Sequence, residues 1–231
     1  MTLLGKAALV LSFDIAPEAI VEHDKWHSQE HFQERMSVPG FLRGSRWVAL
    51  AGKPNYFVLY EVADIDTLAS PAYLERLNNP SPWNARMMQH YRGMKRGFCR
   101  VTASFGLGLG QVGLLLRFSP RPEEETGLRQ WLCGEVLSAL PLRDGLVSAH
   151  LLEAAAKPDF TQEQVIRGKD AGVDWVVLVT GYDLPSVEAL AGKELSAQQL
   201  EGRGVTGMAA GIYQMQHSLT EREVAASKLE S

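Results

Sequence analysis

The sequence predicts an α+β fold in which two tandem β-α-β-β-α-β repeats place their antiparallel sheets face to face inside one chain. Three observations support this prediction: the chain length, an internal repeat, and the alternation of segments typical of strands and helices. The chain has 231 residues, of which 45% are hydrophobic and 22% are charged, as in ordinary globular proteins. This length is enough for one large domain or for two small ones of about 100 residues each.

The internal repeat becomes visible when the chain is aligned with itself at an offset of 105 residues and, further on, of 119 residues. The matched segments are LVLSFDIAPE (9–18) with LLLRFSPRPE (114–123), and NYFVLYEVAD (55–64) with DWVVLVTGYD (174–183). The first match continues without a gap, so that Trp26 aligns with Trp131 and Glu30 with Glu135. The offset grows because the second copy contains a longer loop, KPDFTQEQVIRGKDAG. Two matched blocks in the same order indicate an internal duplication.

The first repeat is expected to contain four strands and two helical regions. Its strands are predicted at about 6–14, 41–50, 56–62 and 95–105, and its helical regions at about 17–38 and 64–92. Leu, Val and aromatic residues favour the strands. Pro17 suits the first turn of a helix, where Glu18 and Glu22 interact favourably with the helix dipole. Pro39 and Gly40 end this helix, and three prolines interrupt the second helical region.

The second repeat follows the same order after the glycine-rich link GLGLG. Its strands are predicted at about 111–119, 145–154, 175–182 and 205–217, and its helices at about 123–140 and 184–201. We therefore expect a ferredoxin-like repeat at 1–108, a second one at 109–220, and a polar C-terminal tail at 221–231. Such repeats form an antiparallel sheet with helices on one face. The strands carry apolar residues on both faces, so the bare face must be covered. Two facing sheets would cover each other as an intrachain, pseudo-dimeric α+β barrel.

Composition and charge argue against several classes of protein. The net charge is −4 and no run of Lys and Arg forms a basic face, so we expect no nucleic-acid partner. No stretch of about 18 apolar residues is present, so we expect no membrane span. The N-terminal segment MTLLGKAALVLSFDIAPE is interrupted by Asp14 and is predicted to be a strand, not a signal peptide. Cys99 and Cys133 are far apart and fit a reducing compartment, which indicates a cytoplasmic location.

A polar stripe marks the first helix, within and just before the segment KWHSQEHFQERMSVPGF (25–41). Its members, which lie within about one third of the helix circumference, are His23, His27, Glu30, His31 and Glu34. The aligned positions of the second repeat are Leu128, Leu132, Glu135, Val136 and Ala139. Four of these five are apolar, so that face is expected to be buried. If the two helices pack alike, the histidines also face inward, where a polar group needs a hydrogen bond. A polar pocket, a satisfied structural network and a solvated face all remain open.

The pattern His27-x-x-Glu30-His31 also contains the letters of a zinc-peptidase motif. His27 and His31 are one turn apart and could share a metal ion, but catalytic zinc needs a third protein ligand. Glu61 and His90 are among the candidates, and nothing in the sequence singles one out. We therefore predict neither a metal nor a cofactor. Without a metal, a histidine titrates near neutral pH and can act as a general base or acid, and a neighbouring carboxylate would orient it.

The letters WHSQEH, followed by PGF within a β-α-β-β-α-β repeat, resemble the EthD-like branch of the dimeric α+β barrel superfamily. This superfamily includes antibiotic-biosynthesis-type monooxygenases and muconolactone isomerase-like proteins. The resemblance covers 6–105 and extends over 111–218 at the level of fold only. It implies a small organic molecule bound between sheet and helices, in many members without a cofactor. His31 matches the motif histidine of the branch, whereas the second repeat has Leu132 and Val136 at the histidine positions. The resemblance therefore implies chemistry in the first repeat alone.

These observations lead to one functional hypothesis and one alternative. The hypothesis is a cofactor-independent enzyme of the oxygenase, isomerase or cyclase type that acts on a small organic metabolite. The candidate catalytic residues are His31, Glu30 and His27, and the candidate ligand-binding residues are Trp26, Glu34, Arg43, Trp47 and Tyr60. Arg43 would meet a carboxylate or enolate oxygen, and Trp47 and Tyr60 would line an aromatic pocket. The alternative is a non-catalytic small-molecule-binding or assembly protein of the same fold, with structural histidines. Whether two chains form a homodimer stays open.

Overall fold

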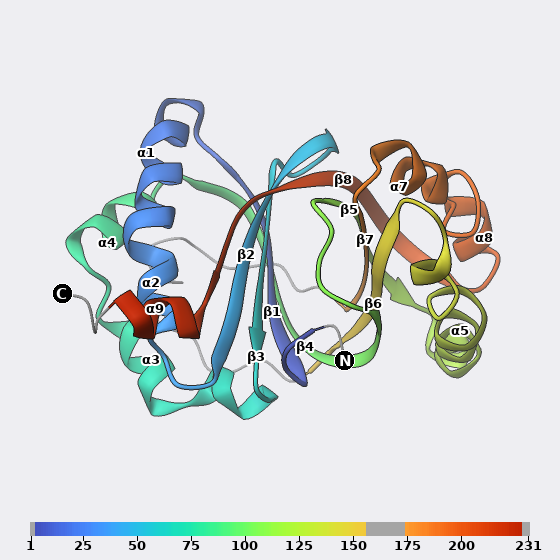
Figure 1. Ribbon diagram of the computed structural model, residues 1–231, viewed down its shortest axis with the longest axis horizontal. Helices are drawn as coiled ribbons and strands as arrows, with labels where there is room; N and C mark the ends of the chain where they lie inside the picture. The colour runs from blue at the N-terminus through green and yellow to red at the C-terminus, as the bar shows by residue number, and fades with distance from the viewer. Residues whose placement is uncertain (1–2, 156–173, 228–231) are drawn as a thin grey trace.

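Within the residues that the computed structural model describes, 3–155 and 174–227, eight antiparallel strands close into one barrel (Figure 1). The strands are β1 (Ala7–Ile15), β2 (Phe41–Gly52), β3 (Tyr56–Val62), β4 (Tyr91–Gly106), β5 (Val112–Pro120), β6 (Leu146–Ala154), β7 (Trp175–Gly181) and β8 (Val205–Thr220). Around the barrel their order is β1-β3-β2-β8-β5-β7-β6-β4. The expected α+β class and the closure of the sheets into one barrel are confirmed. The expected long loop of the second repeat lies outside the described residues.

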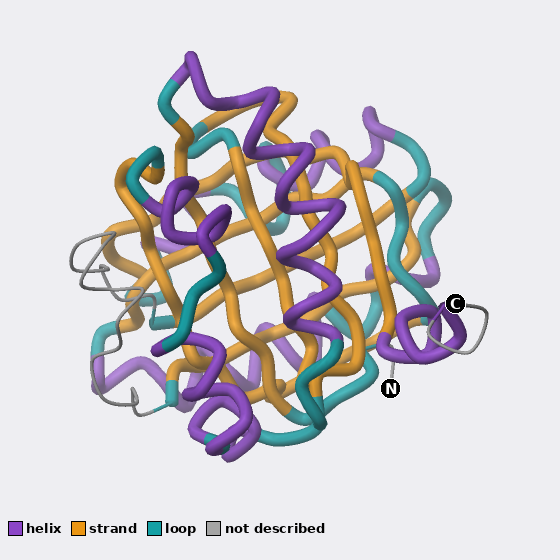
Figure 2. The backbone as a smooth tube through the Cα atoms, turned by 90° about the vertical axis from the view of Figure 1, so that its left-hand side faces the viewer, coloured by secondary structure: helices purple, strands orange, loops and turns teal. Residues whose placement is uncertain are grey.

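Helices cover the barrel on two opposite sides. The first half contributes η1 (Pro17–Ala19), α1 (Ile20–Trp26), η2 (His27–His31), α2 (Phe32–Met36), η3 (Ile65–Ala69), α3 (Pro71–Asn78) and α4 (Pro82–Met88). The second half contributes η4 (Pro122–Glu124), α5 (Glu125–Trp131), η5 (Leu132–Val136), η6 (Leu140–Leu142), α7 (Leu184–Ala191) and α8 (Ala197–Glu201). Figure 1 shows these groups at the two ends of the molecule, and Figure 2 shows the first-half helices lying across the outer face of the strands.

Each half of the chain forms a four-stranded section of the barrel, β4-β1-β3-β2 in the first half and β8-β5-β7-β6 in the second. The two sections join where β2 pairs with β8 and where β4 pairs with β6. Apolar side chains therefore fill three separate layers, one under each group of helices and one inside the barrel. Because side chains alternate between the two faces of a strand, each strand contributes to one outer layer and to the interior.

Two boundaries differ from the expectation. β4 begins at Tyr91 instead of 95, because its first residues pair with the end of β1, Tyr91 with Ile15 and Arg92 with Asp14. The segment expected as a polar tail contains a helix, α9 (Glu221–Ser227). Thr220 and Glu223 cap this helix reciprocally: the Thr220 backbone N–H donates to the Glu223 carboxylate at 2.7 Å, and the Glu223 N–H donates to Thr220 Oγ1 at 3.4 Å. This is the capping-box arrangement.

The two halves share unusual backbone features at the same sequence offsets as the matched segments. A π-helical turn interrupts the long helix in each half, η2 and η5, 105 residues apart. Gly40 and Gly145 have positive φ angles of +91° and +84°, and a Cβ at either would strike a side chain of the next helical segment, Thr67 or Ser186. Only glycine tolerates both the backbone conformation and the close approach.

Candidate active site

A small cavity lies between the first-half helices and the outer face of the sheet. Its polar lining residues are His27, His31, Arg35, Tyr60, Tyr73, Tyr91 and Arg96, and Leu9, Leu11, Met88 and Met94 complete its wall. The cavity volume is about 20 Å³, which is enough for about one water molecule. Buried imidazole, guanidinium and phenol groups thus converge on one small space.

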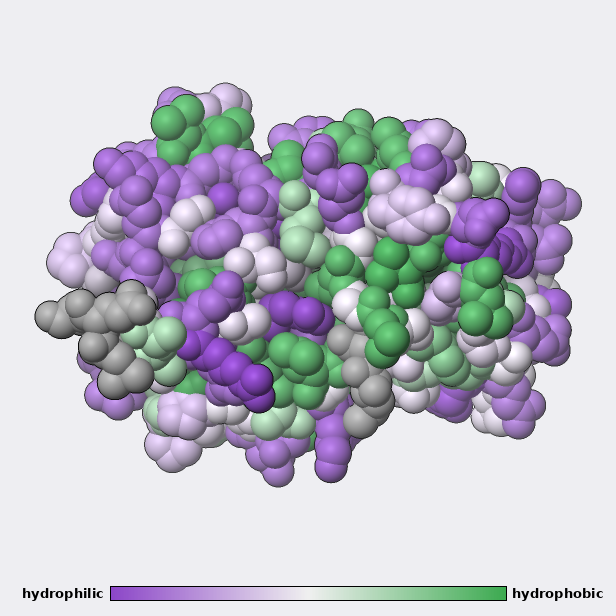
Figure 3. Space-filling model, viewed as in Figure 1, coloured by the Kyte–Doolittle hydropathy of each residue, from purple (hydrophilic) through white to green (hydrophobic). Residues whose placement is uncertain are grey.

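Three histidines of the long helix form a buried row, and two of them, His27 and His31, line the cavity. His23, His27 and His31 are 0%, 1% and 5% exposed, as the apolar residues at the aligned positions predict. Successive rings lie 5.4 Å and 5.2 Å apart between centroids, and the Trp26 indole packs 4.5 Å from the His31 ring. Figure 3 shows polar side chains over much of the outward face around α1. The histidines therefore occupy the opposite, inward side of the helix.

The helix is locally widened at the cavity. The π-helical turn η2 begins at His27 and ends at His31, so both imidazoles that line the cavity belong to it. Single π-helical turns inside longer helices occur often at functional sites. The second half has the same turn with Leu132 and Val136 in place of the two histidines, and both of these side chains are buried. The turn is thus common to both halves, while the histidines belong to one.

His27 has a ring nitrogen that makes no hydrogen bond to any described residue. Within the described part of the chain, its buried Nδ1 atom has no hydrogen-bond partner. Burial lowers the pKa of His27 well below its ordinary value, and the nearby His31, His23 and Arg46 lower it further. The imidazole is therefore neutral at neutral pH. A neutral imidazole has one unprotonated nitrogen, which can accept a hydrogen bond from a ligand.

Two buried arginines give the cavity a cationic wall. Arg96 is buried, and its Nη2 donates to the Tyr73 hydroxyl at 2.8 Å while its guanidinium lies 4.7 Å from the Phe98 ring centre. Arg35 is also buried, with its guanidinium 5.6 Å from the centre of the Tyr73 ring. Guanidinium groups stay charged and bind oxyanions in planar geometry. An anionic oxygen that develops on a ligand in this cavity would be stabilised.

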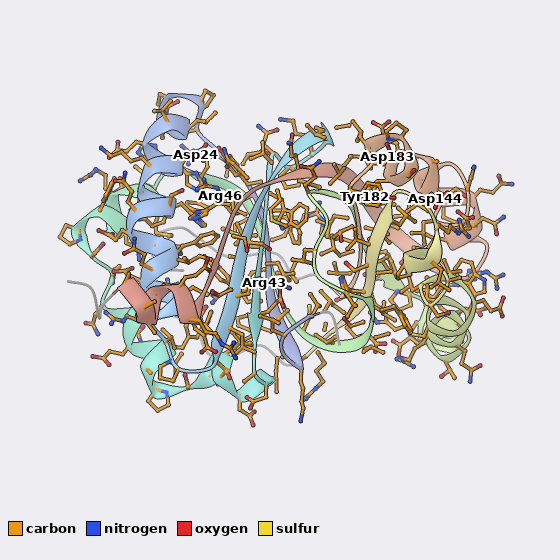
Figure 4. The ribbon with its side chains drawn as sticks, in the orientation of Figure 1. Asp24, Arg43, Arg46, Asp144, Tyr182 and Asp183 are labelled. Carbon is orange, nitrogen blue, oxygen red and sulfur yellow. The ribbon has the colours of Figure 1, made fainter. Side chains whose placement is uncertain are left out.

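Asp24 of α1 lies outside the cavity lining and binds groups next to it. Its Oδ1 atom accepts from the Tyr56 hydroxyl at 2.9 Å and lies 3.1 Å from His23 Nδ1. Arg46 of β2 donates from Nη1 to the Asp24 carbonyl at 3.2 Å, and Figure 4 shows the two residues facing each other. Burial raises the pKa of Asp24, but His23, Arg46 and Tyr56 outweigh this and leave the pKa below its ordinary value. The carboxylate is therefore ionised at neutral pH.

The predicted carboxylates lie outside the cavity lining. Glu30 accepts from Trp26 Nε1 at 3.1 Å and from Ser81 Oγ at 2.5 Å, so it ties the long helix to the start of α4. Glu34 is half-buried. The proposed role of Glu30 as a partner of His31 remains a prediction, and these bonds assign it a position that links two helices.

Arg43 and Trp47 are not brought together with the histidines. Trp47 packs inside the barrel and its Nε1 donates to Ser45 Oγ at 2.9 Å. Arg43 forms an ion pair with Glu61 at 2.6 Å and lines a separate pocket, further along β2 from Arg46 in Figure 4. Alternation along a strand explains both placements: Arg46 faces the helix, so its odd-numbered neighbours face inward. Neither residue lines the cavity with the histidines, and their ligand-binding role stays a prediction.

Four of the seven polar lining residues were not predicted as site residues from the sequence. Arg35 follows His31 by one helical turn, a spacing that places both on the same side of the helix. Arg96 lies between Met94 and Phe98 in an alternating strand pattern, which marks it as facing the helices. Tyr73 and Tyr91 carried no comparable signal, because only the packing of α3 and the extension of β4 bring them to the cavity.

Residues 3–155 and 174–227 contain neither a metal-binding cluster nor a membrane-spanning helix. No group of three or more His, Cys, Asp or Glu side chains is placed to hold a metal ion. No helix there is both long enough and apolar enough to cross a membrane.

Comparisons with known proteins show the fold. No family model matches the chain, and no curated protein matches its sequence. The chain is similar to the structure of an anthrone oxidase-like protein, with a TM-score of 0.67 and 11% identity over 96% of each chain. It is also similar to a candidate monooxygenase from Fusobacterium nucleatum, with a TM-score of 0.62 and 10% identity, covering 94% of this chain and 95% of that one. A candidate monooxygenase from Lactobacillus acidophilus has a TM-score of 0.59 and 9% identity, with 93% and 96% covered.

At these identities the comparisons establish architecture alone. The chain has an α+β barrel of the dimeric α+β barrel type, which these monooxygenase-like structures share. In this chain the barrel is built from one polypeptide, and the cavity with two histidines and two arginines lies in its first half.

Proposed function

We propose that this protein is a cofactor-independent enzyme that removes a proton from a small organic molecule, with His27 as the base and His31 beside it. The observation that carries this proposal is that His27, a residue of the cavity lining, has a buried Nδ1 atom without a hydrogen-bond partner in the described chain. A substrate proton would supply the missing partner. The histidines, Trp26 and Tyr60 would form the ligand site together with Arg35 and Arg96.

The cavity favours substrates that become anions. When His27 takes a proton from carbon or from a phenol, negative charge develops on the conjugated oxygen of the substrate. Arg35 and Arg96 would stabilise that charge, as preorganised cationic groups do in many enzymes. The anion then has three outcomes: reaction with O₂, return of the proton to another atom, or attack on a carbonyl. These correspond to an oxygenase, an isomerase and a cyclase.

Among these outcomes, we favour the oxygenase reaction, because proteins of similar fold are described as oxidase-like or as monooxygenases. The similar structures include an anthrone oxidase-like protein and candidate monooxygenases. In such a reaction the substrate carbanion would form a C–O bond with O₂ and the resulting peroxide would lose water to give a carbonyl. The substrate supplies all the electrons, so no cofactor is needed.

The cavity is too small for an organic substrate and has to enlarge when one binds. Pockets that enclose organic ligands typically measure about 300–1,000 Å³, whereas this cavity measures about 20 Å³. Tyr73 of α3, Met88 of α4, and Tyr91 and Met94 of β4 form part of the cavity wall. We expect these side chains and the short helices to move outward when a substrate enters.

The test is oxygen uptake with a panel of aryl ketones and phenols, anthrone first, because one similar structure is an anthrone oxidase-like protein. We expect the His27→Gln variant to lose on the order of 100-fold or more in kcat/KM, which is the usual contribution of a general base. The matched control is His90→Gln, since His90 is a half-exposed histidine outside the cavity lining. Equal activity of His27→Gln and the unmodified chain would overturn the proposal.

The small cavity supports one alternative, a non-catalytic binding or assembly protein in which the histidines pack the helix. The His27 ring lies 4.4 Å from Phe32 and 5.8 Å from Trp26, both in edge-to-face geometry. Under this alternative, His31→Ala lowers the free energy of unfolding and no compound of the panel is turned over. Turnover that depends on His27 excludes it.

We infer that the barrel arose by internal duplication, with repeats at 1–108 and 109–220, and that the first repeat belongs to an EthD-like branch. The shared π-helical turns and the paired glycines at equal offsets support the duplication.

The chain closes its own barrel, so a homodimer would pair two complete barrels. Gel filtration with light scattering tests whether such a homodimer forms. A cytoplasmic location is likewise a proposal, consistent with two free cysteines.

A further inference from the structure

A chain of hydrogen-bonded side chains connects the helix surface with the cavity. Asp24 Oδ1 lies 3.1 Å from His23 Nδ1, and His23 Nε2 lies 3.3 Å from the Tyr91 hydroxyl. Tyr91 lines the cavity, His23 is fully buried, and 26% of the Asp24 side chain is exposed. The order carboxylate, imidazole, hydroxyl is that of acid-base catalytic triads.

The protonation states determine the direction of these hydrogen bonds. The Asp24 carboxylate, whose pKa is lowered, can only accept, so His23 Nδ1 must donate to it. Burial lowers the pKa of His23, although Asp24 acts in the opposite direction, and the imidazole is neutral at neutral pH. The lone pair of His23 Nε2 therefore accepts a hydrogen bond from the Tyr91 hydroxyl. The Tyr91 oxygen can then receive a proton while it passes its own to His23.

We propose that Asp24, His23 and Tyr91 form a proton relay and that Tyr91 is a second acid-base group of the cavity, beside His27. This inference rests on the proposed function. A substrate proton moves to the Tyr91 oxygen as the tyrosine proton moves to His23 Nε2. Asp24 stabilises the resulting imidazolium, and the reverse transfers return the proton to the product.

Two acid-base groups suit a substrate that loses two protons from one carbon. Such a substrate has a methylene carbon activated by a carbonyl or an aromatic ring. Oxidation of that carbon to a carbonyl removes two protons from it. His27 takes the first proton, and the carbanion forms a C–O bond with O₂. The second proton enters the relay as the C=O bond forms and the O–O bond breaks. The distal oxygen takes up both stored protons and leaves as water, so one methylene and one O₂ give one carbonyl and one water.

The second half of the chain shows that the fold does not require these residues. The positions aligned with His23 and Asp24 are Leu128 and Arg129. Leu128 is buried at the matching place, and Arg129 instead pairs with Glu153 at 2.6 Å. A leucine would fill the space of His23 without the desolvation of a polar ring. In the first half, by contrast, Tyr56 and Arg46 bind Asp24 and fix it where it can accept a hydrogen bond from His23.

The relay is tested without turnover by NMR of the full chain with ¹⁵N-labelled histidine at neutral pH. We expect His23 to carry its proton on Nδ1, with Nε2 unprotonated, and its signals to be assigned by their loss in His23→Gln. Tyr91→Phe should shift the Nε2 signal. The control Tyr213→Phe, which removes another buried hydroxyl bonded to the Pro54 carbonyl at 2.9 Å, should leave it unchanged. A His23 proton on Nε2, or no response to Tyr91→Phe, overturns the relay.

Its catalytic use is tested by oxygen uptake with anthrone. Tyr91→Phe and Asp24→Asn should each lower kcat on the order of 100-fold, while Tyr213→Phe retains activity. If His27→Gln abolishes turnover and Tyr91→Phe does not, the relay is wrong and the proposed function stands. If the unmodified chain turns over no compound of the panel, the proposed function fails, and the tautomer measurement still decides whether the hydrogen-bonded relay exists.

Discussion

His27 differs from two other buried histidines, His23 and His150, in the partners of its ring. His23 contacts Asp24 and Tyr91, and His150 contacts Ser104 and Ser148. His27 Nδ1 has none among the described residues. A buried polar atom without a partner costs about 1–3 kcal/mol. Such a cost at one position of a well-packed helix is typical of a residue kept for function.

The first prediction at the residue scale concerns this cost. Replacing His27 by Leu, the residue at the aligned position of the second half, removes the unsatisfied nitrogen and keeps an apolar side chain of similar size. We expect the free energy of unfolding to rise by about 1–2 kcal/mol, measured by urea unfolding, while oxygen uptake is lost.

His23→Leu is the matched comparison for that variant. It takes a hydrogen-bond partner from both Asp24 and Tyr91, so we expect the free energy of unfolding to fall by about 1–3 kcal/mol. If both leucine variants changed stability in the same direction, the assignment of His27 as the unsatisfied histidine would be wrong.

The second prediction concerns acid. Burial lowers the pKa of His150 from 6.5 to about 3, with Arg43 contributing, and burial also lowers the pKa of His27. The unfolded chain therefore binds more protons than the folded chain below about pH 6.5, and stability falls as the pH falls. His150 alone should cost about 2 kcal/mol between pH 6.5 and 5. Urea unfolding at pH 5, 6, 7 and 8 measures this slope, which should be shallower in His27→Leu. Equal stability at pH 5 and 7 would contradict it.

Several site residues were accessible from the sequence, and others were not. His27 and His31 were identified because the second half shows which helix face is buried. Tyr60 was found from its place on an apolar strand. Arg43 and Trp47 do not line the cavity with the histidines, and the sequence could not show this, because alternation gives two sets of positions and does not say which one meets the helices.

At the scale of elements, the wall of the cavity depends on how α4 is attached. Ser81 caps α4 by accepting from the Asn84 N–H at 3.0 Å, and its hydroxyl donates to Glu30 of the long helix. This one side chain therefore begins α4 and ties it to the helix that carries the histidines. If the cavity opens by movement of α4, we expect the hydrogen bond between Ser81 and Glu30 to stretch or break.

The third prediction follows from this double role. Ser81→Ala should lower the free energy of unfolding by about 2 kcal/mol, since it removes a cap and a hydrogen bond to a carboxylate. Hydrogen exchange of the α4 amides should become faster. The control is Ser196→Ala, which removes the cap of α8, a single bond to the Gln199 N–H at 3.4 Å, and should cost about 1 kcal/mol or less. Equal effects of the two variants would show that the bond to Glu30 contributes nothing.

At the scale of the whole molecule, barrel closure depends on strands from both halves. β2 pairs with β8 and β4 pairs with β6, and the interior layer draws apolar side chains from both halves. Residues 1–108 alone would expose two strand edges and an apolar sheet face, which promotes association.

The fourth prediction is that a fragment of residues 1–108 forms dimers or larger assemblies. Light scattering measures its mass, and the full chain serves as the control for a barrel closed within one polypeptide. A fragment that stays monomeric and folded at micromolar concentration would contradict the view that the interior layer holds the halves together.

The class of fold, the order of strands and helices, and the helix face that bears the histidines could all be predicted from the sequence. These follow from local patterns and from comparison of the two halves, because periodicity and turn residues act over a few positions. Only the tertiary structure decided which face of β2 meets the helices, that β4 extends to Tyr91, and that Asp24, His23 and Tyr91 lie in line. Those facts depend on contacts between segments distant in the chain, whose geometry no local pattern encodes.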